Sequence, residues 1–351
     1  MDRVEILLNE LDKTARVIEI GPSYNGLTPK RDGWDCAIID HDTQDGLVAK
    51  YTHYPEVDTS KIEPVDFVWR GGSLLDTVPS HLHGTFDAFI ASHVIEHTTD
   101  VIAFLQAACA LIKPEGRIIL ALPDKRKCFD LYRPLSTTGE AIVAHRENRS
   151  RHNMRTHLDY GLLMATRNGG PGWFINEQGR AKFYSDFSVA NDFADRASSP
   201  EYVDAHQWIF VPASFELLVL ELNQIGLLDL QIDKVMEAGP IEFYAWLKPG
   251  KLTIRAEDVH DFRVDLMDRQ IVELAEQSRQ IADSPLNNAE HEISDLKALI
   301  AEYHIPLAAG ETMASAMNRY LSQRLENQEI RSTKSIFDKL VELARIRKKN
   351  L

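Results

Sequence analysis

The chain has 351 residues, 44% of them hydrophobic, which is enough to bury a core of full size and to carry an appendage beside one large domain. Its 39 lysines and arginines against 53 acidic residues give a net charge of −14, which would repel the phosphate backbone of a nucleic acid. No segment approaches the roughly 20 apolar residues of a membrane span. Three widely spaced cysteines fit reduced core thiols. We therefore expect a cytoplasmic protein without a nucleic-acid partner or a membrane span.

Short apolar strands alternate with helical stretches over the first third of the chain. The pattern predicts a helix at 1–12, strands at 16–20, 35–42, 66–69, 86–92 and 116–122, and a helix at 100–112. Strands that are apolar on both faces and separated by helices indicate a parallel sheet covered on both sides. This part of the chain is predicted to be an α/β domain.

The alternation stops at Pro123 and resumes near residue 211. Residues 123–211 are rich in Arg, His, Asn, Gly and aromatic residues and show no clear period. A helix is then predicted at 211–227, followed by strands at 228–236 and 242–248. The connection between these two strands is too short for a parallel crossover, so we expect them to pair antiparallel at the sheet edge.

Beyond Lys251 the composition changes, and the apolar residues recur at helical spacing. Helices are predicted at 259–283, 288–303, 313–327 and 332–349, without the sustained heptads of a long coiled coil. We expect this helical region to pack on the core or on a second subunit, and we favour a homodimer formed through it.

The stretch RVIEIGPSYNGL, residues 16–27, ends a strand in a loop with Gly21 and Gly26. Such a loop lets a ligand approach the main chain, although a tight turn is the alternative. Ser23 stands where the NAD-binding pattern needs its second glycine, and no phosphate-binding P-loop pattern occurs. Asp40 ends the next strand, where a carboxylate can hold both hydroxyls of a ribose. Asp40 indicates a nucleoside, and it does not choose between NAD and S-adenosylmethionine.

Four segments carry a family resemblance: VIEIGPSYNG, IIDHD, FDAFIASHVIEHTTD and IKPEGRIILALPDKR. In order and spacing they resemble the motifs of class I S-adenosylmethionine-dependent methyltransferases, in particular the type 11 group. The resemblance covers residues 14–125, and 206–248 by topology. It implies an α/β fold with a Rossmann-like, mostly parallel sheet and an antiparallel last strand. The run PDKRKCFDLYRPLSTTGEAIVAH looks like a bacterial subgroup associated with glycan assembly.

The same resemblance divides the chain into four parts. We expect a cofactor-binding half at 1–125 and an acceptor-binding insertion after the fifth strand at 126–211. The closing helix and antiparallel edge strands would occupy 212–250, and a helical C-terminal appendage 251–351.

Carried over position by position, the resemblance implies that S-adenosylmethionine is the cofactor. Glu19 would lie near the methionine amino group, and Asp40 would hold the ribose. The remaining assignments are Gly21, Ser23 and Gly26 for main-chain contacts, Gly72, Ser73 and Leu74 beside adenine, and Ser92 and His93 beneath the methionine moiety. Pro22 and Ser23 depart from the more glycine-rich family pattern, which affects the loop geometry and not the fold.

Methyl transfer from a sulfonium is an in-line displacement, so alignment of the acceptor supplies much of the rate. A base is needed only when the acceptor is a hydroxyl. His206 is our first candidate for that base, because an imidazole titrates near working pH. The alternative is that His206 only hydrogen-bonds a loop. Asp124, His145 and His157 are further candidates.

His93 and His97 stand four residues apart in SHVIEH. Their spacing is not the HExxH pattern, because the glutamate is Glu96, and no third ligand is evident. We therefore expect no metal here, and capping or cofactor-pocket roles for both histidines.

The segment HRENRSRHNMRTH, residues 145–157, carries four arginines and three histidines in an acidic chain. A basic patch suits an acceptor that bears phosphate or carboxylate, and a solvated loop with paired arginines is the alternative. We assign Arg151, Arg155 and His157 to acceptor binding. Trp208, like Trp173 and Phe174, would stack on a sugar ring or form a small satellite core.

The sequence thus predicts an S-adenosylmethionine-dependent O-methyltransferase that acts on a sugar, nucleotide sugar or glycan precursor. The alternative is a catalytically weak or inactive methyltransferase-like scaffold that acts through its helical C-terminus. A third reading, an NAD-dependent enzyme, is disfavoured by Ser23 and by the final antiparallel strand pair.

Overall fold

The computed structural model describes residues 2–177, 179–252 and 254–279, together with Ser294, Lys297, Ser315 and Arg319. The chain divides into two compact units, 1–280 and 281–351. The predicted helices at 288–303, 313–327 and 332–349 lie outside the described residues apart from those four positions, and every element below belongs to the first unit.

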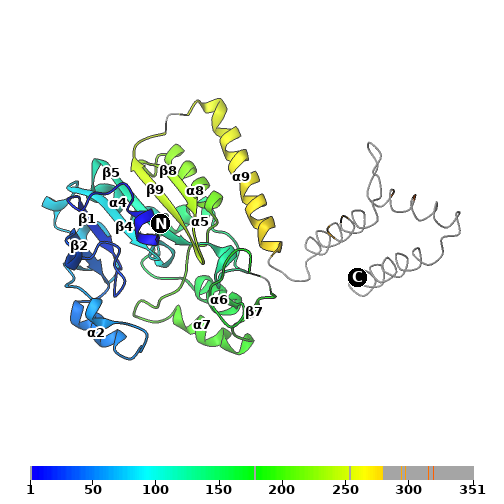
Figure 1. Cartoon of the computed structure of the whole chain (residues 1–351), viewed down its shortest axis with the longest axis horizontal. Helices are drawn as coiled ribbons and strands as arrows, with labels where there is room; N and C mark the ends of the chain where they lie inside the picture. The colour runs from blue at the N-terminus through cyan, green and yellow to red at the C-terminus, as the bar shows by residue number, and fades with distance from the viewer. Residues whose placement is uncertain are drawn as a thin grey trace. The chain divides into compact units, whose positions relative to one another are not determined.

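A seven-stranded sheet runs through this unit in the order β3-β2-β1-β4-β5-β9-β8 (Figure 1). Strands β1 to β5 are parallel, whereas β9 lies between β5 and β8 and is antiparallel to both. The predicted α/β fold, with an antiparallel pair of strands ending a mostly parallel sheet, is therefore confirmed. The strands are β1 (Arg16–Ile20), β2 (Asp35–Asp40), β3 (Phe67–Val68), β4 (Phe86–Ser92), β5 (Ile112–Pro123), β8 (Leu230–Glu237) and β9 (Glu242–Pro249).

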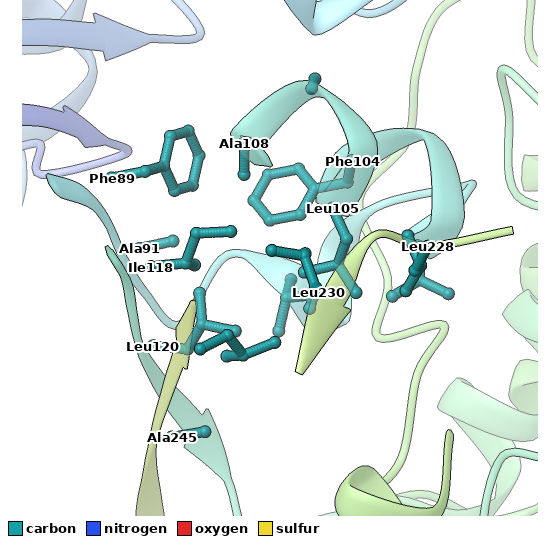
Figure 2. Close-up of a cluster of buried hydrophobic side chains, with 14 of the residues drawn as sticks. Phe89, Ala91, Phe104, Leu105, Ala108, Ile118, Leu120, Leu228, Leu230 and Ala245 are labelled. Atoms are coloured by element: carbon teal, nitrogen blue, oxygen red, sulfur yellow. The ribbon is translucent and has the colours of Figure 1, made fainter. Parts of the chain in front are cut away.

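Both faces of the central strands are buried. Successive side chains of a strand point to opposite faces, so each strand contributes side chains to both sides of the core. Figure 2 shows the face on which β4 and β5 meet α4 (Val101–Leu111). The buried residues drawn there include Phe89, Ala91, Phe104, Leu105, Ala108, Ile118 and Leu120. On the other face, Ala88, Ile90 and Ile119 pack with Trp246 of β9 and with Leu7 of the N-terminal helix α1 (Arg3–Leu7). This two-sided burial explains the continuous apolar runs in the sequence.

The helices that flank the sheet follow the expected order with shifted ends. The N-terminal helix α1 is shorter than the predicted 1–12 and begins at a capping box built on Asp2 and Glu5. After the insertion, α8 (Pro212–Gln224) is followed along the chain by β8, β9 and α9 (Ala256–Arg279). The other short helices are α2 (Gln44–Tyr51), α3 (Leu74–Thr77) and the 3₁₀ turns η1 (Lys30–Asp32), η2 (Thr59–Lys61), η3 (Ser80–Leu82) and η4 (Ile95–His97).

Helix α9 packs along α8 through charged pairs. Arg263 contacts Glu221 at 2.7 Å and Arg269 contacts Glu216 at 2.8 Å, nitrogen to oxygen. These contacts place α9 within the compact unit that ends at 280. None of the helices in the described part of the chain is long and apolar enough to cross a membrane.

The insertion between β5 and α8 contains regular structure that its sequence pattern did not predict. It comprises η5 (Lys125–Lys127), α5 (Thr138–Arg146), α6 (Met154–Leu163), β6 (Ala165–Thr166), β7 (Lys182–Phe183), η6 (Phe187–Val189) and α7 (Ala190–Arg196). Its two ends lie side by side, since the Lys125 amide donates to the Phe210 carbonyl at 3.0 Å. The insertion therefore leaves the sheet and rejoins it at one place.

Candidate functional site

The glycine loop after β1 is held by the carboxylate of Glu19. This side chain is almost fully buried and accepts hydrogen bonds from the amides of Leu27 (2.7 Å) and Thr28 (2.9 Å) and from the Thr28 hydroxyl (2.8 Å). Burial raises the pKa of Glu19, and the three hydrogen bonds oppose that rise. Glu19 thus fixes the far end of the loop against the strand that precedes it.

The loop itself adopts backbone conformations that suit glycine. Gly21 has a φ of +68°, and a Cβ at this position would lie 2.8 Å from Cγ2 of Val94. Ser23 also has a positive φ, +44°. A Cβ at Gly26 would meet Pro22 at 3.4 Å and Glu19 at 3.6 Å. The main chain of the loop is therefore packed closely on β1 and on the turn after β4.

Asp40 ends β2 next to this loop. Its Oδ2 accepts hydrogen bonds from the Ser23 amide (2.9 Å) and hydroxyl (3.3 Å), and its Oδ1 accepts from the His41 amide and lies 2.7 Å from His41 Nδ1. Ser23, which replaces a glycine of the expected pattern, thus ties the loop to the carboxylate. Glu19, Ser23, Gly26 and Asp40 line one small cavity.

The remaining predicted cofactor residues lie at the ends of β3 and β4. Gly72 has a φ of +76°, Ser73 caps α3 by accepting from the Asp76 amide, and Leu74 is buried in the core. Ser92 ends β4, and His93 follows it. Because β1 to β4 are parallel neighbours, their carboxyl ends share one edge of the sheet. All ten residues predicted to bind the cofactor come to this edge.

His93 joins a charged network that ties α1 to the sheet. His93 Nε2 lies 2.9 Å from Glu242 Oε2, while the Arg3 guanidinium donates to both oxygens of Glu242 (2.7 and 2.9 Å) and to the Ser92 hydroxyl (2.6 Å). Burial opposes the charged form of both side chains, yet the carboxylates of Glu242 and Glu96 raise the pKa of His93 to about 9, and Arg3 and His93 lower that of Glu242 to about 2. The N-terminal helix is thereby anchored beside the predicted methionine site.

A second polar group forms where η4 meets the end of the insertion. The Glu96 carbonyl accepts from the amides of Gln207 (2.6 Å) and Trp208 (3.2 Å), which brings His206 next to Glu96 and His97. The Glu96 carboxylate is 1% exposed, and neither of its oxygens has a hydrogen-bond partner among the residues the structure describes. It lies 3.5 Å from His93 Nδ1 and 3.8 Å from His97 Nε2.

Both imidazoles of this group are oriented by carboxylates. His206 Nδ1 lies 2.6 Å from Asp130 Oδ2, and His97 Nδ1 lies 2.8 Å from Asp204 Oδ1. The two rings meet edge to face with their centroids 4.6 Å apart. His206 is buried, and its Nε2 is the nitrogen that Asp130 leaves available.

The other candidates for the base are placed less favourably. Asp124 is fully buried and bound by the Arg126 guanidinium, so its carboxylate has no open side that an acceptor can reach. His145, which lies on α5, pairs through Nδ1 with Asp100 at 2.9 Å. His157 is buried in α6, and its Nδ1 lacks a hydrogen-bond partner among the described residues.

The residues assigned to the acceptor are partly engaged elsewhere. Arg155 is 63% exposed but pairs with Glu140 (2.9 Å) and Asp159 (3.3 Å), and Arg151 donates to the Ser199 carbonyl at 3.0 Å. Trp208 is buried in the main core, where its indole donates to the Thr98 carbonyl, so no ring face is open for a sugar. Trp173 belongs to a small satellite core.

Next to this basic segment lies a groove whose charges are mixed. Its lining residues include Arg133, Glu140, Glu147, Arg149, Arg155 and Asp159. These are three arginines and three carboxylates, which fits the alternative of paired arginines as well as a polar binding surface.

Several residues of the site were not predicted from the sequence. Glu96 and His97 were considered together, but His206 is more than a hundred positions away and was expected to be a general base or a residue that hydrogen-bonds a loop. Asp130, Asp204 and Glu242 carried no local signal, since each is defined by the histidine that it contacts across the fold.

Comparison with known proteins assigns the family. A family model described as a methyltransferase domain matches residues 1–196, more than half of the chain. The mitochondrial ubiquinone biosynthesis O-methyltransferase of Bos taurus is 26% identical over 110 residues, which cover 31% of this chain and 29% of that protein. The match therefore spans less than a third of the curated relative.

Solved structures align at low identity. A crystal structure described as a zinc-dependent alcohol dehydrogenase from Rhodobacter sphaeroides aligns with a TM-score of 0.39 and 14% identity, over 71% of this chain and 90% of that one. The CcbJ methyltransferase of Streptomyces caelestis aligns with a TM-score of 0.37 and 10% identity, over 70% and 87% of the two chains.

The sheet order and the family model agree with each other. The predicted resemblance to class I methyltransferases is confirmed, and the family indicates S-adenosylmethionine as the cofactor. With its glycine loop, Asp40 and antiparallel β9 in place, this chain belongs to the methyltransferase-domain family.

Proposed function

We propose that this protein transfers a methyl group from S-adenosylmethionine to a hydroxyl of a small acceptor molecule. The observation that carries the proposal is the shared edge at the ends of β1, β2 and β4, where the glycine loop, Asp40 and His93 converge in a chain of the methyltransferase family. Oxygen is the acceptor atom we favour, because the curated bovine relative is an O-methyltransferase.

In the proposed complex the cofactor lies along this edge. Asp40 binds the ribose hydroxyls, which replace its hydrogen bonds to Ser23 and His41, and charge-assisted bonds of this kind are strong when shielded from water. Glu19 acts at the methionine end, through the loop that it holds. Gly72, Ser73 and Leu74 flank adenine, while Ser92 and His93 lie beneath the methionine moiety.

The acceptor approaches from the side of η4 and the insertion. We propose His206 as the residue that activates the acceptor hydroxyl, because Asp130 fixes its ring and leaves Nε2 available. The hydroxyl loses its proton, its oxygen attacks the methyl carbon, and the carbon–sulfur bond breaks to leave a neutral thioether. Alignment of oxygen, carbon and sulfur supplies much of the rate.

Sugars, nucleotide sugars and glycan precursors are the acceptor class we propose. The support is the polar groove beside residues 145–157, in which Arg155 remains largely exposed. Replacing Arg155 and Arg151 with alanine should raise the KM of an acidic acceptor while kcat is retained, because a binding contact is lost. An unchanged KM would contradict an acidic acceptor.

Calorimetric titration tests the cofactor. The full chain should bind S-adenosylmethionine and its demethylated product, and Asp40→Ala should weaken both by roughly tenfold or more through the loss of charge-assisted hydrogen bonds. Asp42→Ala is the matched control, because Asp42 follows the same strand but pairs with Arg70, and its affinity should stay unchanged. Binding of neither sulfur ligand, or of NAD alone, would refute the proposal.

Once binding is established, the acceptor class is tested by mass spectrometry. Sugars, nucleotide sugars and glycan fragments are incubated with the protein and S-adenosylmethionine, and a methylated product identifies the acceptor. The absence of product from the whole panel, with cofactor binding intact, would remove this acceptor class and leave the cofactor assignment standing.

A further inference from the structure

Glu96, His97 and His206 form a compact group of potential metal ligands. One nitrogen or oxygen from each side chain lies within 4.8 Å of the others, and no second group of this kind is found in the described part of the chain. Glu96 and His97 come from η4, and His206 comes from the end of the insertion.

The environment of the Glu96 carboxylate favours a bound cation. It is 1% exposed, and neither oxygen accepts a hydrogen bond from any described residue. A buried carboxylate without hydrogen bonds is costly to fold, and a charged neighbour that does not hydrogen-bond it offsets only part of that cost. The imidazole nitrogens His93 Nδ1, at 3.5 Å, and His97 Nε2, at 3.8 Å, make no hydrogen bond to it. A cation between Glu96 and the two histidines would satisfy the carboxylate.

The surroundings of the two imidazoles resemble the outer shell of a metal site. Metal-binding histidines usually direct their second ring nitrogen at a carboxylate, which fixes the ring and raises the basicity of the ligand atom. Asp130 does so for His206 at 2.6 Å, and Asp204 does so for His97 at 2.8 Å. In both rings Nε2 is left as the ligand atom.

We propose that Glu96, His97 and His206 bind one divalent transition-metal ion, with Asp130 and Asp204 orienting the two imidazoles. Two nitrogen ligands and one carboxylate suit Zn²⁺, Mn²⁺ or Co²⁺ better than Mg²⁺ or Ca²⁺, which prefer oxygen ligands. Bonds of about 2.1 Å hold ligand atoms within about 4.2 Å of each other, so binding draws the three side chains slightly together. This site replaces our expectation from the sequence that the SHVIEH segment binds no metal.

The bound cation would activate the acceptor hydroxyl in the proposed reaction. Three protein ligands leave a coordination position open for a water molecule or an acceptor hydroxyl. This step rests on the proposed function: the acceptor hydroxyl binds the cation, its pKa falls, its proton passes to water, and the oxygen attacks the methyl group. With the cation bound, Nε2 of His206 is a metal ligand, so the general-base role proposed above applies only to the metal-free protein.

Metal titration tests the site without any methyl transfer. The full chain is stripped with a chelator, and Zn²⁺ and Mn²⁺ are titrated in separate calorimetric experiments without cofactor. We expect one equivalent to bind, and Glu96→Gln and His206→Gln to weaken binding by at least tenfold. Asp204→Asn, at a largely exposed position, should weaken it by about 10- to 100-fold as the loss of an outer-shell partner does.

His83→Gln is the matched control. This imidazole is also partly buried, but its Nε2 lies 2.8 Å from the Val78 carbonyl, and it belongs to no group of potential metal ligands among the described residues. Its metal affinity should equal that of the unmodified protein. The absorption spectrum of bound Co²⁺ gives a second readout, and we expect His206→Gln to change it and His83→Gln to leave it unchanged.

The outcomes separate this inference from the proposed function. A protein that binds neither Zn²⁺ nor Mn²⁺, or one whose binding survives both Glu96→Gln and His206→Gln, overturns the metal site while S-adenosylmethionine binding stands. Metal binding that requires these residues supports the site even if the cofactor titration fails. Should Glu96→Gln not fold, unchanged metal affinity in Asp204→Asn and His206→Gln would still overturn it.

Discussion

Gly21 meets two constraints at once, and only its residue type satisfies both. Its φ of +68° lies in the left-handed region, and a Cβ would stand 2.8 Å from a methyl carbon of Val94. Gly33 has a φ of +90° but open space where its Cβ would be. Substitutions at Gly21 and Gly33 therefore separate the cost of the left-handed backbone conformation from the cost of the clash with Val94.

We expect Gly33→Ala to lower the free energy of unfolding by about 1 kcal/mol, because only the left-handed backbone is penalised. Gly21→Ala should lower it by about 1 to 3 kcal/mol more, because Val94 must also move. Denaturant unfolding measures both values, and equal losses would show that the contact with Val94 is unimportant. Calorimetry should find weaker S-adenosylmethionine binding for Gly21→Ala and unchanged binding for Gly33→Ala.

Asp40 and Glu96 mark how far single residues were predictable. Asp40 follows a recognisable strand at the expected distance from a glycine loop, so its place at the sheet edge followed from local pattern. Glu96 sits between an isoleucine and a histidine, where nothing in the local sequence indicates burial. It is buried because the chain returns more than a hundred residues later and binds the Glu96 carbonyl through Gln207 and Trp208.

At the level of elements, an ionic network adds to the apolar packing that holds α1 against the sheet. Glu242 at the start of β9 receives Arg3 and His93, and burial would otherwise raise its pKa. The pairing instead lowers it from the ordinary 4.5 to about 2. A lowered pKa contributes stability that is fully present above pH 4.5 and is lost as the pH falls through 2.

Glu242→Gln should therefore destabilise the protein above pH 4.5 and matter less at each lower pH. The difference in unfolding free energy between the two proteins should shrink by about 2 to 3 kcal/mol between pH 4.5 and pH 2. Urea unfolding at several pH values measures it. A difference that stays constant across this range would mean that Glu242 has no lowered pKa in the folded protein.

The elements divide into those that sequence pattern predicted and those that it did not. The strands of the sheet were found within a few residues, because a strand buried on both faces leaves a continuous apolar run. Helix α6 was missed because the residues that it buries are Thr156, His157 and Gly161, none of which is a large apolar residue. A Cβ at Gly161 would lie 2.4 Å from the Phe193 ring of α7, so this packing leaves no hydrophobic period to read.

For the whole molecule, the boundary between the compact units falls at 280. A change in composition at Lys251 suggested an earlier border, but α9 is joined to the first unit by Arg263, Arg269 and Gln277. Such pairs between distant segments leave no trace in composition. The border of a folded unit therefore depends on contacts that only the fold reveals.

We predict that a fragment of residues 1–280 folds cooperatively and binds S-adenosylmethionine with the affinity of the full chain, because it keeps every residue assigned to the cofactor. Thermal unfolding and calorimetry compare the two. If the predicted C-terminal helices join two copies, light scattering should find a dimer for the full chain and a monomer for the fragment. A fragment that fails to bind the cofactor, or remains dimeric, would contradict the respective part of this prediction.

The two ends of the insertion lie side by side, where the Lys125 amide donates to the Phe210 carbonyl. The insertion touches the sheet elsewhere as well, since Lys127 Nζ donates to the Glu242 carbonyl of β9. Because its chain departs and returns at neighbouring positions, its length can change without separating the end of β5 from the start of α8. If the insertion binds the acceptor, as we expect from the sequence, exchanging this segment changes the acceptor and leaves cofactor binding intact. His206 and Asp204 sit just inside the returning end, so a graft that retains residues 204–211 would keep those two residues while changing what surrounds them.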